Sequence, residues 1–337
     1  MTSKAIITAL VLATLAALPA QAQQKPLTLA VSGKALIGQL PPTLAERLGF
    51  FRDEGLAVDA LDFEGGTKSV DAVVGGSADM MFGALEYTIV LQPKGMDLVT
   101  VVLDVNKAGI VFALAPDLAK KYHGPLDLKG LKIGVTAPGS ATENILRIVL
   151  QKSGLDLSDV SEIGIGSGGS AIAAMTTGRV DGLIIADPVM TTLTDAGTVV
   201  PIIDMRTEAG QNYIYGGPTA FGGSFVRADF IKAHPDLVQS YVNAIVRTLH
   251  WMQKAGPEKI FATVPPEYYG SNPDIYKRSL AAALHTYVAD GRVTMDEVKN
   301  TYQQLLSAGR LKPTDKVDLA ATFDNRFVDA ANKKYPD

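Results

Sequence analysis

Two stretches, GTKSVDAVVGGSAD at residues 66–79 and GGSAIAAMTTGRVD at residues 168–181, repeat one pattern at an offset of 102 residues. Gly76 aligns with Gly178, and Asp79 aligns with Asp181. Each copy reads as a glycine-rich turn, a short helix and a Gly-x-x-Asp turn, and an apolar run follows it. Self-similarity at a fixed period predicts two units of supersecondary structure that are built in the same way.

The repeat continues upstream of both stretches. The first unit predicts a strand, a helix and a strand at 27–33, 42–51 and 56–63, and the second predicts the same order at 131–139, 140–154 and 160–165. Strands that alternate with helices form largely parallel sheets covered on both faces. We therefore expect an α/β protein of two Rossmann-like lobes, each with a mixed, mainly parallel sheet.

Two further segments are candidates for crossings between the lobes, at 102–116 and 214–226. Two crossings would form a hinge about which the lobes close. Open α/β sheets bind ligands at the carboxyl ends of their strands, so a cleft between two such lobes suits a small molecule.

The second copy also contains a G-x-G-x-x-G pattern at 164–169, with Asp187 at the end of a later apolar run. This arrangement suggests a dinucleotide-binding fingerprint. However, the pattern follows the second strand of its unit rather than the first, and the first unit lacks it. We expect a tight turn into a helix instead, and no bound NAD.

Composition excludes several classes of function. The chain has 337 residues, 47% of them hydrophobic and 20% charged, with a formal net charge of −4 and no cysteine. A packed globular protein is expected, without disulfides or thiolate chemistry, and without a basic patch for nucleic acid. The four histidines are scattered, and no nucleophile-elbow motif is present. We expect no metal, no cofactor and no enzymatic activity.

The N-terminus has the features of a secretory signal peptide. Lys4 precedes an apolar run at 5–18, and Ala20-Gln21-Ala22 forms an A-x-A cleavage site. The run is shorter than the ~20 residues of a membrane span. We expect residues 1–22 to be removed after Ala22 and the mature chain, starting at Gln23, to be exported to the periplasm.

Candidate ligand-binding residues lie where the predicted strands end and the predicted helices begin. Ser140 with Glu143 forms an S-x-x-E capping box, and a helix start with free N–H groups also suits an anion. Asp187, Glu86 and Tyr215 each have a structural alternative: a turn before proline, a solvated charge and hinge packing, respectively. The candidates are Ser32, Gly33, Lys34, Gly66, Thr67, Ala84, Glu86, Pro138, Gly139, Ser140, Ala141, Thr142, Asp187 and Tyr215.

The charge of the solute can also be anticipated. No arginine lies in a predicted cleft loop, whereas a dianion such as sulfate usually requires bidentate donors. We therefore expect a small monoanionic or zwitterionic organic solute.

Several stretches together resemble the periplasmic substrate-binding proteins of ABC importers of the nitrate/sulfonate/bicarbonate family, which have the type 2 periplasmic-binding fold. The matching stretches are LGFFRDEGLAVD (48–59), GGTKSVDAVVGGSADMMFGA (65–84), DLKGLKIGVTAPGSATE (127–143), GRVDGLIIADP (178–188) and FIKAHPDLVQSYVNAIVRTLHWM (230–252). The resemblance covers nearly all of residues 27–330.

The resemblance implies a division of the chain and a role. It implies lobe 1 from 23–112 with 224–337, and lobe 2 from 113–223. It also implies that residues 138–142 line the cleft and that a monomer delivers solute to an inner-membrane permease and its ATPase. The solute stays open among sulfonates, carboxylates, nitrate or bicarbonate, and pyrimidines. Two alternatives share the fold: a periplasmic sensor for a receptor kinase, and a binding protein for a pyrimidine precursor of thiamine.

Overall fold

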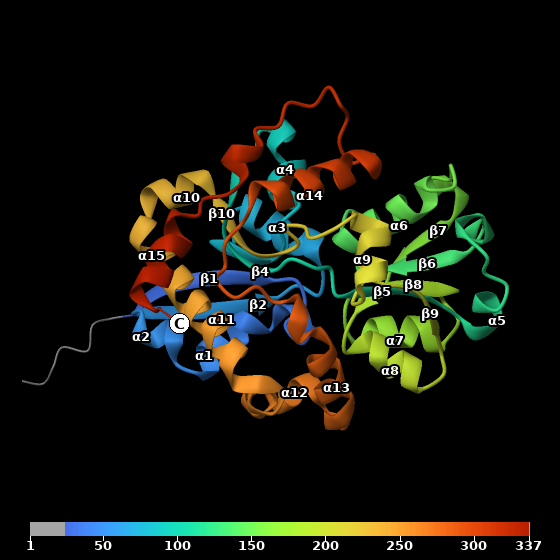
Figure 1. The fold of residues 1–337 in the computed structure, drawn as a ribbon, viewed down its shortest axis with the longest axis horizontal. Helices are drawn as coiled ribbons and strands as arrows, with labels where there is room; N and C mark the ends of the chain where they lie inside the picture. The colour runs from blue at the N-terminus through green and yellow to red at the C-terminus, as the bar shows by residue number, and fades with distance from the viewer. Residues whose placement is uncertain (1–23, 337) are drawn as a thin grey trace, which may run out of the picture.

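The computed structural model describes residues 24–336, so the expected signal peptide lies outside the described residues. The chain forms two lobes, each built on a five-stranded sheet (Figure 1). The strand order is β2-β1-β3-β10-β4 in lobe 1 and β7-β6-β8-β5-β9 in lobe 2. The two orders are equivalent strand by strand, which confirms the two-lobed α/β architecture expected from the repeat.

Four strands of each sheet run in one direction and the fifth runs against them. In lobe 1, β1 pairs in parallel with β2 and β3, whereas β10 is antiparallel to β3 and β4. In lobe 2, β6 pairs in parallel with β7 and β8, and β5 is antiparallel to β8. The strands are β1 Lys25–Val31, β2 Leu56–Asp62, β3 Met80–Ala84, β4 Leu98–Val105, β5 Ile110–Leu114, β6 Lys132–Val135, β7 Ser161–Gly164, β8 Gly182–Ala186, β9 Val200–Asp204 and β10 Gly222–Arg227.

The antiparallel strands are the two that follow a crossing between lobes. The chain passes from β4 to β5 at residues 106–109, and returns from lobe 2 to β10 at residues 216–221. A strand that enters its sheet from the cleft must run away from the cleft, whereas the other strands run towards it. The expected boundaries at 112/113 and 223/224 fall inside β5 and β10, so the hinge segments are shorter than the sequence indicated.

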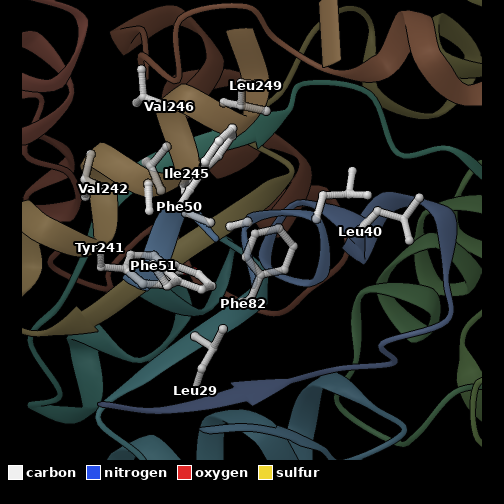
Figure 2. Close-up of a cluster of buried hydrophobic side chains, with 14 of the residues drawn as sticks. Leu29, Leu40, Phe50, Phe51, Phe82, Tyr241, Val242, Ile245, Val246 and Leu249 are labelled. Atoms are coloured by element: carbon white, nitrogen blue, oxygen red, sulfur yellow. The ribbon is translucent and has the colours of Figure 1, made fainter. Parts of the chain in front are cut away.

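Helices cover both faces of the lobe 1 sheet. One face packs against α1, α2, α11 and α15, and Phe51 stacks on Tyr241 in this core at a ring separation of 5.6 Å (Figure 2). The other face packs against α3, α4 and α14. The helices of this lobe are α1 Leu40–Arg47, α2 Phe50–Asp53, α3 Gly66–Val74, α4 Tyr87–Val90, α10 Ala228–Ala233, α11 Pro235–Thr263, α12 Pro266–Tyr269, α13 Pro273–Ala283, α14 Met295–Ser307 and α15 Arg326–Lys334.

Lobe 2 follows the same plan with fewer helices. One face of its sheet packs against α6 and α9, and the other packs against α7 and α8. Helix α14 of lobe 1 extends over the junction and contacts α6 and α9 (Figure 1). The helices are α5 Pro116–Ala119, α6 Ala141–Gln151, α7 Gly169–Thr176, α8 Val189–Asp195 and α9 Glu208–Tyr215, and the short 3-10 turns of the chain are η1 Ile37–Gln39, η2 Gln92–Lys94, η3 Pro125–Leu128, η4 Leu157–Asp159, η5 Leu284–Thr286 and η6 Leu319–Thr322.

Two expected helices are interrupted, each at a residue that ends a helix. The helix expected at 42–51 divides into α1 and α2 because Gly49 adopts φ 77°. The helix expected within 230–252 divides at His234, because Pro235 cannot donate the N–H that a continuous helix needs and instead begins α11. Neither break alters the lobes.

Candidate functional site

A cavity lies between the two lobes beside the hinge. It encloses about 90 Å³, several times the ~10–15 Å³ that a water molecule needs. The described residues that line it come from both lobes and from both crossings. They are Ser32, Leu36, Ile37, Gly38, Gln39, Gly66, Gly83, Ala84, Val105, Lys107, Ala108, Gly109, Ile110, Thr136, Ser140, Ala141, Thr142, Ala186, Asp187, Phe221, Gly222, Ala283 and Thr286.

The N-terminus of α6 forms the lobe 2 wall of the cavity. The first N–H groups of a helix have no acceptor within it. The N–H of Glu143 donates to Ser140 Oγ at 3.5 Å, and the N–H of Asn144 donates to the Ser140 carbonyl at 3.1 Å. Within residues 24–336, the N–H groups of Ala141 and Thr142 have no acceptor. Two main-chain donors and the positive end of the helix dipole therefore remain at this wall.

One hydroxyl group at the same wall has an O–H donor that is not used within the wall. Thr142 Oγ1 accepts from the Thr136 N–H at 2.9 Å, and lies 3.0 Å from Thr136 Oγ1 and 2.8 Å from Ser140 Oγ. A hydroxyl donates once and accepts at most twice. Thr142 can therefore take a proton from only one of the two neighbouring hydroxyls, and the other keeps its O–H free for a solute.

The capping box expected at Ser140 is formed only in part. Ser140 Oγ accepts the Glu143 N–H, as in a capping box. The Glu143 carboxylate, however, accepts from the main chain of Gly139 and from Arg147, the latter at 2.5 Å. Burial acts to raise the pKa of Glu143, but these two partners outweigh it and lower that pKa. Ser140 thus begins the helix and faces the cavity at once.

The lobe 1 wall is built by close approach of the main chain. Ser32 follows β1, and its hydroxyl lies 3.5 Å from Gln39 Oε1. A Cβ on Gly83 would lie 2.7 Å from Ser32 Oγ, so β3 needs glycine beside this serine. The N-terminus of α3 enters the cavity at Gly66. Together these groups give this wall a hydroxyl, an amide and exposed main chain.

Two ionisable side chains line the described cavity wall, Lys107 and Asp187. Lys107, in the first hinge segment, has no ion-pair partner within residues 24–336. Asp187 is 2% exposed, and its carboxylate accepts from Thr191 and, at 2.9 Å, from Arg206. Hydrogen bonds to Asp204 raise the pKa of Arg206 against the effect of burial, and Asp187 adds to the rise. Lys107 is therefore the only cationic side chain among the described lining residues, whereas Asp187 shares Arg206 with Asp204 behind the wall.

The lobes touch on both sides of the cavity. On one side, the α4 rim, Thr67 Oγ1 donates to the Pro138 carbonyl at 2.8 Å, Tyr87 donates to the Gly139 carbonyl at 3.3 Å, and Asn144 donates to Glu86 at 2.5 Å. On the other side, the α13 rim, the Ile37 N–H donates to the Asp187 carbonyl at 3.0 Å, and Arg278 pairs with Asp195. These contacts define a closed arrangement.

The structure brings part of the predicted site together. Among the candidates, Ser32, Gly66, Ala84, Ser140, Ala141, Thr142 and Asp187 line the cavity. Thr67, Glu86, Pro138 and Gly139 lie in the α4 rim, and a Cβ on Gly33 would lie 2.9 Å from Ser167 Oγ of lobe 2.

Two candidates lie away from the cavity wall. The ammonium of Lys34 donates to the Ala60 carbonyl at 3.2 Å, which directs it along lobe 1. Tyr215 is buried and makes an edge-on contact with Phe221 at 6.1 Å, so Phe221 and not Tyr215 reaches the wall.

Most of the remaining lining residues are ones that sequence reasoning missed. Leu36–Gln39 form a short turn between β1 and α1, and residues 107–110 are the hinge itself. Ala283 and Thr286 come from the C-terminal third of the chain, where no local signal relates them to the cleft. Lys107 lies inside the crossing expected at 102–116. A charged residue in a predicted hinge was therefore the signal that could have identified it as a lining residue.

The G-x-G-x-x-G segment forms the turn expected from its context. It joins β7 to α7, and β7 is an edge strand. None of its glycines lines the cavity.

Across residues 24–336 the structure contains neither a cluster of three metal-ligating side chains nor a helix with the length and apolar character of a membrane span.

Comparison with known proteins shows which family and which solved structures this chain is similar to. The sequence matches the model of the NMT1-like family over residues 20–264. A solved protein of Bordetella bronchiseptica RB50 is 39% identical, with a TM-score of 0.88, and the match covers 94% of this chain and 99% of that one.

More distant solved structures share the fold. The alkanesulfonate-binding protein SsuA of Xanthomonas axonopodis pv. citri, bound to MOPS, is 20% identical with a TM-score of 0.70, covering 90% of this chain and 100% of that one. The periplasmic nitrate-binding protein NrtA of Synechocystis PCC 6803 is 14% identical with a TM-score of 0.75, covering 93% and 90%. The desulfurization enzyme DSZB also has the fold, at 17% identity, a TM-score of 0.63 and coverage of 91% and 99%. The chain therefore belongs to the NMT1-like family and has the two-lobed fold of the alkanesulfonate-binding protein SsuA and the nitrate-binding protein NrtA.

Proposed function

We propose that this protein is the solute-binding component of an ABC-type importer, which captures a small organic anion or zwitterion between its lobes and delivers it to a membrane permease and its ATPase. The observation that carries the proposal is the cavity, which two similar lobes enclose by touching on both sides of it. A two-crossing hinge gives such lobes a way to open and admit solute.

The cavity chemistry favours the anion over the zwitterion. Lys107, the free N–H groups of Ala141 and Thr142, and a spare hydroxyl proton all suit an acidic group. Asp187 cannot serve an ammonium group well, because Thr191 and Arg206 already occupy its carboxylate. Because Lys107 is the only cationic side chain among the described lining residues, a monoanion of the sulfonate or carboxylate class is better matched than a dianion.

The other expectations for the chain fit this role. Export through a signal peptide cleaved after Ala22 would place the protein in the periplasm, where the SsuA and NrtA homologues with this fold function. Solute capture needs no enzymatic step. Among the described lining residues, the one carboxylate is held by Arg206, and the chain offers no cysteine nucleophile. We propose a monomeric binding protein and not an enzyme.

A thermal-shift screen of the mature protein, produced from Gln23, tests the proposal. The protein is first unfolded and refolded to remove any solute carried over from the host. A ligand at 100 times its Kd stabilises the folded state by ~2.7 kcal/mol. The panel contains sulfonates, carboxylates, nitrate, bicarbonate and pyrimidines, with NAD, Ca²⁺ and alkylammonium ions as controls.

The outcomes of the screen separate the alternatives. A shift with one or more organic monoanions, but not with alkylammonium ions of equal size, is the expected result. A shift with NAD alone would overturn the proposal and favour the glycine turn at 164–169 as a nucleotide site. A shift with alkylammonium ions alone would overturn the assignment of an anion.

A further inference from the structure

The α4 rim contains a buried hydrogen-bonded bridge that joins the lobes. Asn144, in the first turns of α6, belongs to lobe 2, whereas Glu86 and Arg310 belong to lobe 1. Asn144 Nδ2 donates to Glu86 Oε1 at 2.5 Å, and Arg310 Nη1 donates to Asn144 Oδ1 at 2.6 Å. Asn144 is 2% exposed and Glu86 is 9% exposed. We propose that Asn144 is a positioning residue for closure, whose amide bridges Glu86 and Arg310 of lobe 1 and so holds the two lobes together around solute.

An amide side chain matches this position chemically. The bridge needs a donor towards the Glu86 carboxylate and an acceptor towards the Arg310 guanidinium. A primary amide supplies both groups, two bonds apart, while an aspartate would lack the donor and a leucine would lack both. The hydrogen bond from Arg310 has a charged donor, which makes it stronger than a bond between neutral groups.

Lobe 1 holds Arg310 in place independently of Asn144. Helix α14 ends at Ser307, and Gly309 adopts φ 65° directly after the helix. The N–H of Arg310 then donates to the Leu305 carbonyl at 2.9 Å, which fixes the turn. The main chain at Arg310 is therefore fixed to the end of α14, and the guanidinium extends from there to Asn144 of α6.

The bridge sits among further charges that Arg310 also faces. Glu143 and Arg147 lie beside Asn144 on α6, and Glu162 lies on β7. Burial, and then the neighbouring Glu143, raise the pKa of Glu162 to about 7, while Arg147 and Arg310 oppose the rise. We expect opening to expose Glu86 to water, so removal of Asn144 should leave Glu86 buried without its donor in the closed form only. The cost therefore falls on closure and not on the folding of either lobe.

The α13 rim supplies a contrast within the same molecule. Arg278 and Asp195 also join lobe 1 to lobe 2, but their side chains are 60% and 42% exposed. Exposed ion pairs are screened by water and contribute little. Closure should therefore depend strongly on Asn144 and weakly on Arg278.

A disulfide that can form only between closed lobes measures this dependence without any solute. A Cβ on Gly65 of lobe 1 would lie 3.6 Å from the Cβ of Ala137 of lobe 2, within the ~3.5–4.5 Å range of disulfides. The chain has no cysteine, so the double variant Gly65→Cys/Ala137→Cys carries one pair. Its rate of disulfide formation with oxidised glutathione is proportional to the closed population, even when that population is small.

Three substitutions are then added separately to the double variant. Asn144→Ala should slow disulfide formation by about tenfold, the factor that corresponds to ~1.4 kcal/mol. Arg278→Ala should slow it by about twofold or less. Asn212→Ala, an exposed asparagine of lobe 2 outside both rims, should leave the rate unchanged. Equal rates for Asn144→Ala and Asn212→Ala would overturn the proposal.

A double-mutant cycle distinguishes loss of the bridge from a general folding defect. Arg310→Ala should also slow disulfide formation, and the loss in the combined variant should be smaller than the sum of the two separate losses, because both substitutions remove the hydrogen bond between Asn144 and Arg310. Additive losses would contradict the bridge, and far-ultraviolet circular dichroism checks that each variant is folded. The inference rests on the proposed function only in that closure retains a solute. If the solute screen failed but Asn144→Ala still slowed disulfide formation, only the proposed solute class would be rejected.

Discussion

Asp104 is a fully buried carboxyl group in β4, and neither of its oxygens has a hydrogen-bond partner within residues 24–336. Burial raises the pKa of Asp104 well above its usual range. Folding therefore binds a proton at this site at any pH between the ordinary and the raised pKa. Across that interval the native state holds more protons than the unfolded state, so stability falls as the pH rises.

The Asp104→Asn variant can fold without taking up a proton at this site. At neutral pH the variant should be more stable than the wild type, because it avoids a proton uptake that costs ~1.4 kcal/mol for each pH unit above the ordinary pKa of aspartate. The gain should shrink as the pH falls towards 4, where the unfolded carboxyl also becomes protonated. Urea unfolding at several pH values measures both effects, and a variant less stable than the wild type at neutral pH would contradict this account of Asp104.

Lys107 is the second residue whose environment leads to a prediction. It lines the cavity at the hinge and has no ion-pair partner among the described residues. Lys107→Met keeps much of the apolar length and removes the charge, so an organic monoanion should bind about tenfold more weakly. Titration calorimetry with the anion identified in the screen measures the loss. Lys121→Met, at an exposed position of lobe 2, is the matched control and should bind as the wild type does.

At the scale of elements, α6 combines a structural and a binding role at one residue. Ser140 caps the helix and faces the cavity. Thr294 caps α14 in a complete capping box outside the cavity wall. Replacing either residue by alanine should cost about 1 kcal/mol of stability. Solute affinity should fall for Ser140→Ala and stay unchanged for Thr294→Ala, as calorimetry would show. Equal affinities would assign Ser140 to capping alone.

The sequence predicted elements well where their signals are local. The repeated Gly-x-x-Asp turns at Asp79 and Asp181 precede β3 and β8, which hold equivalent places in the two sheets. The Ser140 cap predicted the start of α6 and with it one wall of the cavity. In both cases the residues that carry the signal are neighbours in sequence of the feature that they specify.

The parts that the sequence could not predict depend on contacts between distant segments. Thr286 reaches the cavity, and Arg310 reaches Asn144, only because the C-terminal third packs back on lobe 1 and over the junction. The direction of Lys34 was equally hidden, because its acceptor on β2 is 26 residues away in sequence. Side-chain direction and long-range pairing are set by packing, which no local pattern records.

At the scale of the whole molecule, closure should take up a proton at Glu86. In the closed form burial raises the pKa of Glu86, while Arg310 and the Asn144 amide act against the rise and Glu143 adds to it. Tyr87 and Tyr215 also face this carboxyl, and burial raises the pKa of both, so they stay neutral. We expect opening to expose Glu86 to water and to return it to its ordinary pKa. The closed form is therefore favoured below the raised pKa and becomes less populated as the pH rises through the interval between the two values.

Glu86→Gln removes this titration and keeps an acceptor for Asn144. Disulfide formation in the Gly65→Cys/Ala137→Cys background should be measured with and without Glu86→Gln from pH 5 to 8. The ratio of the two rates cancels the pH dependence of the thiols themselves. The wild-type rate should fall relative to that of the Glu86→Gln variant as the pH rises. At low pH a proton on Glu86 favours the closed form, and Glu86 loses this proton as the pH rises. The Glu143–Glu162 pair lies within lobe 2 and is present in both proteins, so its titration also cancels to a first approximation. A ratio that is flat with pH, or that rises, would show that Arg310 and Asn144 keep Glu86 ionised in the closed form.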